Sequence, residues 1–199
     1  MSKKKLGILL SGRGSNFAAI ADSVAAGRID ADIAVVISNR ASAAGLDGAR
    51  ARGIDAVAIP SLGMDREIYD QLVLAELEQR KVDLVCLAGY MRMLSPSFVR
   101  TYPRRILNIH PSLLPAFPGL DAQRQAFDHG VKIAGCTVHF VDEQLDGGPI
   151  ILQSAIEVRA EDTHDTLAAR ILAEEHKLYT QAINLVLGGK CRIEGRRVI

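Results

Sequence analysis

The chain contains no tryptophan, few other aromatic residues and almost no net charge, and these absences exclude several classes of partner. Proteins that bind single-stranded nucleic acid stack the bases on aromatic side chains, yet only 5% of the 199 residues here are aromatic. A net charge of +1 provides no broad basic surface for a polyanion. We therefore expect no nucleic-acid partner, and we expect any phosphate to be bound by a single loop.

Cysteine is scarce, and long apolar runs are absent. Cys86, Cys136 and Cys191 match no zinc-binding spacing, and their odd number argues against a disulfide framework. Cys86 and Cys136 lie in apolar runs, so we expect them in the core. The N-terminal segment has too few apolar residues for a secretory signal, and no run approaches the ~20 residues of a membrane span. The sequence thus predicts a cytoplasmic protein with no metal and no membrane partner.

What the sequence does contain is a regular alternation of short apolar runs and helical patterns. Strands are predicted at 5–10, 31–38, 54–60, 82–89 and 105–110, with helices at 16–26, 42–52, 65–80 and 97–101. In the helix at 65–80, the spacing places Ile68, Leu72 and Ala75 on one apolar face. This alternation predicts an α/β fold with a doubly wound, mostly parallel sheet flanked by helices.

The pattern changes in the last third of the chain. The runs at 133–141 and 149–158 predict an antiparallel strand pair at one side of the sheet. A long helix follows at 163–187, and the tail from Lys190 predicts a small hairpin. No linker or repeat interrupts the chain, and its length suits one α/β core. We expect a single domain over residues 1–199.

Ligands of an open parallel sheet bind beyond the carboxyl ends of its strands, and the segment SGRGSN (11–16) lies at such an end. Its glycines let the backbone approach a ligand, and the helix start together with the Ser15 hydroxyl suits a phosphate. The segment lacks the third glycine of a dinucleotide-binding loop and the lysine of a P-loop. A tight turn with an Asn or Ser helix cap is the alternative explanation.

Asn108 and His110 end the predicted strand at 105–110, and their spacing points both side chains to one face. An asparagine amide donates to a developing oxyanion, and a histidine moves protons near neutral pH. A polar strand end that bonds to the following loop would explain the same pair.

Three further polar residues are candidates for a site. Asp146, in the loop DEQLDGG (142–148), is placed to bring a carboxylate against an imidazole, or else it belongs to an acidic surface turn. His139 shares a face with Thr137 by alternation, and we expect it to pack within its strand. Glu175 borders the apolar stripe of the last helix, where it either enters a cleft or belongs to a solvated flank.

Four motifs in order, SGRGSN, LAGYMRML, LNIHPSLLPAFPGL and TVHFVDEQLDGGPII, resemble those of the phosphoribosylglycinamide formyltransferases. These are folate-dependent enzymes of purine synthesis, and the resemblance covers nearly the whole chain. It implies a Rossmann-like formyltransferase fold, small-molecule substrates, 10-formyltetrahydrofolate as co-substrate, no metal, and a monomer or homodimer.

The resemblance also implies roles for individual residues. Asn108, His110 and Asp146 match the catalytic set. Phosphoribosylglycinamide would be held at its phosphate by Gly14, Ser15 and Asn16, and at its ribose by Glu175. The folate would be held by Arg66, Met91, Arg92, Met93, Leu94 and Asn108, with the loop from Asp142 to Asp146 closing over it. The substrate amine would attack the formyl carbon, Asn108 and protonated His110 would stabilise the tetrahedral oxyanion, and Asp146 would assist proton transfer.

Two related enzymes and one non-enzyme compete with this interpretation. A formyltetrahydrofolate deformylase looks similar in the catalytic core, but that family carries an N-terminal regulatory domain and a second histidine where Pro111 stands here. A methionyl-tRNA formyltransferase shares the catalytic residues but needs a further C-terminal domain and a basic surface. A non-catalytic nucleotide-binding module would have no reason to combine Asn108, His110 and Asp146.

Overall fold

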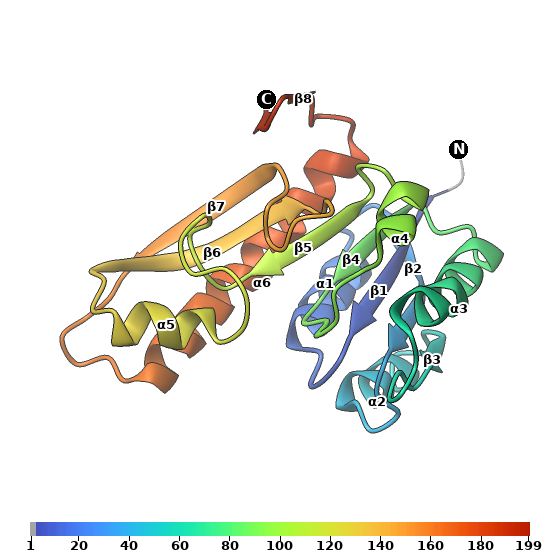
Figure 1. The fold of residues 1–199 in the computed structure, drawn as a ribbon, viewed down its shortest axis with the longest axis horizontal. Helices are drawn as coiled ribbons and strands as arrows, with labels where there is room; N and C mark the ends of the chain where they lie inside the picture. The colour runs from blue at the N-terminus through green and yellow to red at the C-terminus, as the bar shows by residue number, and fades with distance from the viewer. Residues whose placement is uncertain (1–2) are drawn as a thin grey trace. The chain divides into compact units, whose positions relative to one another are not determined.

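The computed structural model describes residues 3–199, which divide into two compact units. The first unit ends at Leu107 and the second begins at Asn108, so the boundary falls inside the strand β5 (Ile106–His110). Figure 1 shows the helices and strands of each unit by label and colour.

In the first unit, strands and helices alternate as the sequence predicts. Its elements are β1 (Lys4–Leu10), α1 (Ser15–Ala25), β2 (Ala31–Ser38), α2 (Ala44–Arg50), β3 (Ala56–Ala58), α3 (Arg66–Gln79), β4 (Leu84–Leu87) and α4 (Pro96–Thr101). The strands lie in the order β3-β2-β1-β4, and each neighbouring pair is parallel. β4 and most of β1 are buried throughout, which is typical of a parallel sheet whose two faces are covered.

The apolar face predicted for α3 is wrong. Ile68 and Leu72 are 62% and 44% exposed, whereas Tyr69, Val73 and Leu77 are buried. Both sets recur at helical spacing, so periodicity alone could not choose between the two faces. Leu77 packs over Gly7 of β1, where a side chain would leave it no room.

The second unit contains the rest of β5 and the elements α5 (Ala122–Asp128), β6 (Ile133–Phe140), β7 (Ile150–Glu157), α6 (His164–Leu187), β8 (Ile193–Glu194) and β9 (Arg197–Val198). Its strands lie in the order β5-β6-β7-β9-β8. The predicted antiparallel pair is confirmed as β6 and β7, and the predicted tail hairpin as β8 and β9. The helix α5 was not predicted from the sequence. The fold class is confirmed as mixed α/β, with mostly parallel strands, flanking helices and an antiparallel pair near the C-terminus.

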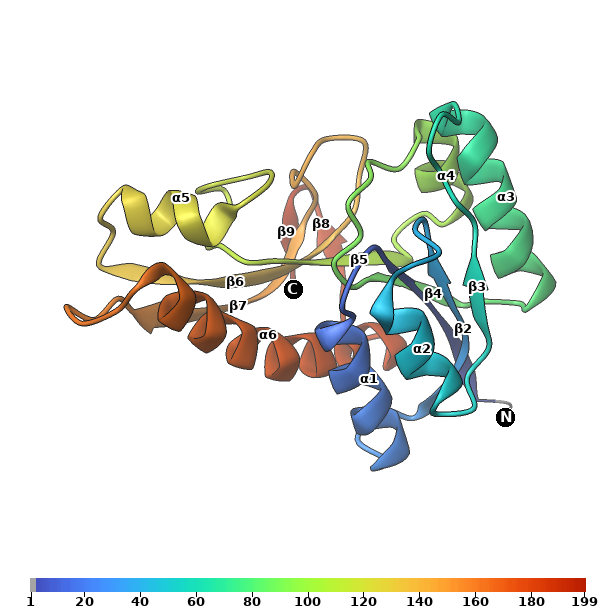
Figure 2. The same ribbon diagram turned by 90° about the horizontal axis from the view of Figure 1, so that it is seen from below.

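α6 lies along β6 and β7, as Figures 1 and 2 both show. A capping box starts it: the Thr163 side chain accepts from the Thr166 backbone N–H, and Thr166 accepts in return. Its buried residues are Leu167, Ile171, Glu175, Leu178, Tyr179, Ala182 and Ile183. Among the helices of residues 3–199, none combines the length and apolar character that crossing a bilayer requires.

Candidate active site

The loop between β6 and β7 carries Asp146 in an uncommon backbone conformation. Its φ is +49°, in the left-handed region that only a few per cent of non-glycine residues adopt. Gly148 follows where a Cβ would meet the Phe140 carbonyl oxygen at 1.8 Å, so only glycine fits there. Arg196 donates to the Gly147 carbonyl over 2.7 Å. The two residues that follow Asp146 are therefore both held in place.

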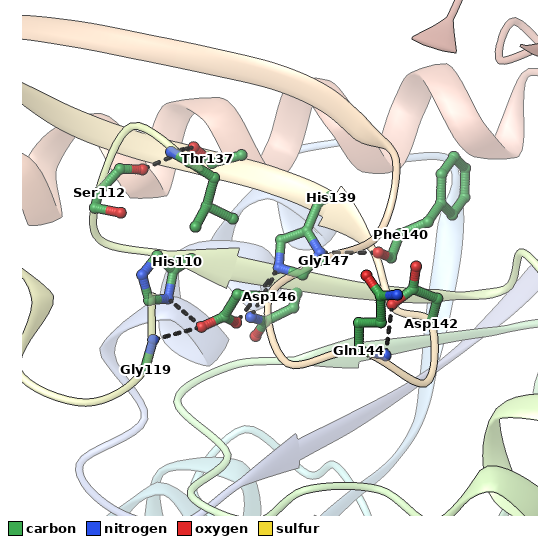
Figure 3. Close-up of polar contacts among 12 residues, drawn as sticks. His110, Ser112, Gly119, Thr137, His139, Phe140, Asp142, Gln144, Asp146 and Gly147 are labelled. Carbon is green, nitrogen blue, oxygen red and sulfur yellow. Dashed lines mark hydrogen bonds and ion pairs between the residues drawn. The ribbon is translucent and has the colours of Figure 1, made fainter. Parts of the chain in front are cut away.

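Asp146 lies beside His110, as Figure 3 shows. His110 Nδ1 is 3.4 Å from Asp146 Oδ2, and the Gly119 backbone N–H donates to the same oxygen over 2.8 Å. On the other side of the ring, His110 Nε2 lies 2.8 Å from the Phe117 carbonyl oxygen. Both ring nitrogens thus face acceptors, and only the doubly protonated ring donates to both. The surroundings of His110 suit an imidazolium.

Thr137 of β6 fastens the segment that follows His110. Its hydroxyl donates to the Ser112 carbonyl over 2.7 Å and accepts from the Leu114 N–H at 3.0 Å. Gln153 of β7 donates to the same hydroxyl and to the Leu114 carbonyl. These bonds fix the start of the proline-rich loop, whose later residues Phe117 and Gly119 contact His110 and Asp146.

His139 belongs to the same cluster, although the sequence analysis expected it to pack within its strand. His139 Nε2 lies 3.2 Å from Asn108 Nδ2 and 3.8 Å from Asp146 Oδ1. A register shift in the β6–β7 pairing falls between Val138 and His139. The extra residue of this bulge is Ile151 of β7, so β6 keeps its alternation and His139 shares a face with Thr137. The predicted set of Asn108, His110 and Asp146 is therefore brought together with a fourth polar residue.

The pKa of His139 is lowered from its ordinary value, chiefly because the ring is buried and a buried ring resists charging. The charge of His110 acts in the same direction, while the Phe140 carbonyl, Asp146 and Asp142 oppose it. His139 is therefore the neutral histidine of the cluster.

The predicted phosphate loop is in the first unit, at the start of α1. Gly14 is the N-cap residue, in a left-handed conformation, and no side chain caps the helix. The alternative of an Asn or Ser cap is therefore wrong. Asn16 is buried and Ser15 half-buried on the first turn, beneath a loop fixed to α2 by the bond from Gly45 N–H to Gly12 O.

Four of the predicted folate residues form the segment after β4, also in the first unit. Met91 and Arg92 line a hollow of about 500 Å³ together with Asn39, Arg40, Ser61, Leu62, Gly63 and Met64. The Arg92 guanidinium lies 4.5 Å from the centre of the Tyr69 ring, and Arg92 Nε is buried. Met93 is exposed and Leu94 half-buried, and neither lines the hollow; nor does the exposed Arg66 at the start of α3.

Glu175 is 4% exposed, so the alternative of a solvated flank is wrong for it. The flank is formed by Glu174, which pairs with Lys177 and accepts from Ser154. Glu175 faces Cys136, and burial with a contribution from this carboxylate raises the pKa of the Cys136 thiol to about 12. Cys86 and Cys136 are buried, as expected.

Asp142 of the loop accepts from the Gln144 N–H over 2.9 Å. Across residues 3–199, no three His, Cys, Asp or Glu side chains are grouped so as to hold a metal ion.

These observations describe an α/β protein with a buried cluster of an amide, two imidazoles and a carboxylate. Residues 4–183 match the formyl transferase family, and the chain belongs to that family.

Named relatives agree with this assignment. The chain is 43% identical to phosphoribosylglycinamide formyltransferase of Escherichia coli, over 94% of this chain and 88% of that one. It is 54% identical to a glycinamide ribonucleotide transformylase of Symbiobacterium toebii, whose crystal structure matches with a TM-score of 0.96 over 98% of this chain and 93% of that one. It is also 46% identical to the bovine trifunctional purine biosynthetic protein adenosine-3, over 96% of this chain, and spans 19% of that protein's length.

Proposed function

We propose that the chain is a phosphoribosylglycinamide formyltransferase of purine biosynthesis, which transfers the formyl group of 10-formyltetrahydrofolate to the amine of phosphoribosylglycinamide. The observation that supports it most is the proximity of Asn108, His110 and Asp146, in a chain whose relatives carry that name. We also propose that residues 1–199 act as one formyltransferase domain, since the family match extends across both compact units.

The amine of the substrate is itself a nucleophile, so the protein's task is to manage charge and protons. The folate supplies the formyl carbon. The Asn108 amide donates a hydrogen bond to the formyl oxygen as negative charge develops on it, and one such donor contributes about 2.7–4 kcal/mol to lowering the barrier. Because both nitrogens of His110 face protein acceptors, His110 stabilises this charge through its own positive charge.

Asp146 orients the His110 ring and offers a carboxylate that can take a proton from the attacking amine. Its Oδ2 is bonded to the Gly119 N–H and faces His110, while Oδ1 is 3.8 Å from His139. A carboxylate held in this way keeps its orientation without occupying all of its lone pairs, since each oxygen accepts more than one bond. The remaining lone pairs are available to the amine, either directly or through a water.

The substrate-binding roles follow the properties of each group. Gly14, Ser15 and Asn16 present the uncapped first turn of α1, whose N–H groups suit the ribose phosphate. The Glu175 carboxylate suits the ribose hydroxyls. Arg40 and Arg92 beside the hollow suit the glutamate carboxylates of a folate. We propose Arg66, the segment Met91–Leu94 and the loop from Asp142 to Asp146 as the remaining folate contacts.

The test is to incubate the protein with 10-formyltetrahydrofolate, with and without phosphoribosylglycinamide, and to measure both deformylated folate and formylated amine. Product that forms only with the amine supports the proposal. Formate released equally without the amine would identify a hydrolase, and no turnover with either mixture would exclude an enzyme of this class.

The catalytic roles are tested by Asn108→Ala and Asp146→Asn. We expect each to lower kcat on the order of a hundredfold or more, with an unchanged unfolding transition. Asp47→Asn is the control, because this carboxylate is exposed and pairs with Arg50 of its own helix. Near-normal turnover of either site variant would refute the role assigned to that residue.

A further inference from the structure

We infer that His139 is a positioning residue for formyl transfer: its ring, protonated on Nδ1 only, accepts a hydrogen bond from the Asn108 amide and fixes which way that amide faces. This inference rests on the proposed function and assigns a role to a residue outside the predicted catalytic set. Three features of the structure support it: the site of the proton on the ring, the fixed position of the ring and the orientation of the Asn108 amide.

The hydrogen-bond partner of His139 Nδ1 locates the proton on the ring. His139 Nδ1 lies 2.8 Å from the Phe140 carbonyl oxygen, as the dashed line in Figure 3 marks. A carbonyl only accepts, so Nδ1 must carry the hydrogen. A neutral imidazole has one N–H, which leaves Nε2 with a lone pair. The burial that lowers the pKa of His139 keeps the ring neutral.

The His139 ring is held in a fixed position. His139 is 2% exposed, and alternation along β6 places it on the same face as the buried Thr137. The Phe140 carbonyl that accepts from the ring is itself confined, because Gly148 packs directly against it and the Phe140 N–H donates to Pro149 O. The lone pair on His139 Nε2 is thus held in place before any substrate arrives.

The fixed lone pair of His139 determines the orientation of the Asn108 amide. Its Nδ2 lies 3.2 Å from His139 Nε2, which can only accept. The amide must therefore turn its NH2 group to His139, because the flipped amide would set Oδ1 against a lone pair. One N–H of Asn108 is used in this bond and the second is directed elsewhere, available to an oxyanion. A donor fixed in advance stabilises charge without reorganising during the reaction.

The charged groups around His139 agree with this arrangement. Asp146 Oδ1 lies 3.8 Å from Nε2, beyond a hydrogen bond, and Asp142 acts from further away. Both favour a charged ring, but burial and the neighbouring His110 oppose it and prevail. If His139 were charged, Nε2 would donate, and Asn108 would turn its oxygen towards it. The donor proposed for the oxyanion would then point away.

Two matched variants separate the two ends of the ring. His139→Gln places an amide near the position of Nε2, where its oxygen can accept from Asn108. His139→Asn places its amide near Nδ1, where it can donate to Phe140 O but cannot reach Asn108. We expect His139→Gln to keep kcat within about threefold of the wild type and His139→Asn to lose about tenfold or more, with KM for both substrates within about twofold. Equal losses in both variants would overturn the inference.

A double-mutant cycle tests whether His139 acts through Asn108. We expect His139→Leu alone to lower kcat about tenfold or more, yet to cause no further loss in an Asn108→Ala background. Multiplicative losses would show that His139 acts independently and would refute the inference. Urea unfolding of each variant establishes that it folds, and the Gln and Asn pair carries the test if His139→Leu does not.

Nitrogen NMR of the imidazole rings tests the tautomer without any assay of activity. We expect His139 to show a protonated Nδ1 and an unprotonated Nε2 at neutral pH, and a protonated Nε2 would overturn the inference. If the wild type transfers no formyl group, the proposed function fails whatever this spectrum shows. If the wild type is active and the Gln and Asn variants do not differ, the inference alone fails.

Discussion

Gly14 is a position where both the backbone conformation and a close main-chain neighbour favour glycine. Its φ is +77°, and an added Cβ would lie 2.8 Å from the Gly45 Cα atom. Gly27, after the other end of α1, has a similar φ of +69° but nothing within 4 Å of an added Cβ. We expect Gly27→Ala to lower the free energy of unfolding by about 1 kcal/mol, from backbone strain alone. We expect Gly14→Ala to cost roughly 1–3 kcal/mol more, since the clash is with main chain.

Urea unfolding of the two variants measures this difference directly. Equal losses of stability would mean that the loop relaxes away from Gly45 without cost. Because Gly14 begins the proposed phosphate site, we also expect Gly14→Ala to raise KM for phosphoribosylglycinamide, whereas Gly27→Ala leaves this KM unchanged.

Single residues also show where sequence reasoning succeeds and where it stops. Asn108, His110 and Asp146 are visible in the sequence as polar residues at a strand end and in a glycine-rich loop, and the resemblance to the formyltransferases joined them into one set. The structure brings them together as expected. His139 could not be given its place, because alternation fixes the face of β6 that it shares with Thr137 but not the residues of other segments that it meets there. The Phe117 carbonyl that faces the other nitrogen of His110 was equally hidden, since it belongs to the backbone.

At the scale of elements, α3 allows a test with two leucines of the same helix. Leu72 is 44% exposed, on the face that periodicity favoured, and Leu77 is fully buried over Gly7. We expect Leu77→Ala to lower the free energy of unfolding by about 2–5 kcal/mol. We expect Leu72→Ala to cost less than about 1 kcal/mol, because it leaves no cavity. Urea unfolding at one pH measures both, and similar losses would mean that the helix buries the face predicted from the sequence.

The error over α3 has a physical cause. The sequence of α3 carries two apolar stripes, and in each of them the residues recur every three or four positions. The stripe that is buried lies next to Asp70, a charged residue whose presence argues against burial. In the structure the Ser95 N–H donates to Asp70 Oδ2 over 2.6 Å, so the carboxylate has a partner in the interior. Desolvation nevertheless raises the pKa of Asp70. The periodicity of the α3 sequence cannot reveal this partner, because Ser95 belongs to a different segment, at the start of α4.

At the scale of the whole molecule, the order of elements was more predictable than their contacts. Alternating strands and helices predicted a parallel sheet, and the change of pattern after residue 130 predicted the antiparallel pair. The short helix α5 escaped because its seven residues, AQRQAFD, show little amphipathic pattern. The family match spans residues 4–183, so most of both compact units belongs to the shared fold.

The stability of the whole molecule should fall as the solution becomes mildly acidic. Burial lowers the pKa of His139 and of His176 in the folded chain, whereas an unfolded histidine titrates near 6.5. As pH falls through about 6.5, the unfolded chain takes up protons at these positions before the folded chain does. We therefore expect the free energy of unfolding, measured by urea titration, to be full near pH 8 and to decrease between about pH 7 and the lower folded-state pKa values.

Substitution assigns this slope to particular residues. In His139→Gln and in His176→Gln, one titrating group is absent, so we expect stability to vary less with pH than in the wild type. Asp70, whose pKa burial raises, acts in the opposite direction, because the folded chain then holds its proton more tightly than the unfolded chain. Unchanged slopes in both His139→Gln and His176→Gln would mean that neither ring is kept neutral by folding, and for His139 this would contradict the NMR result expected above.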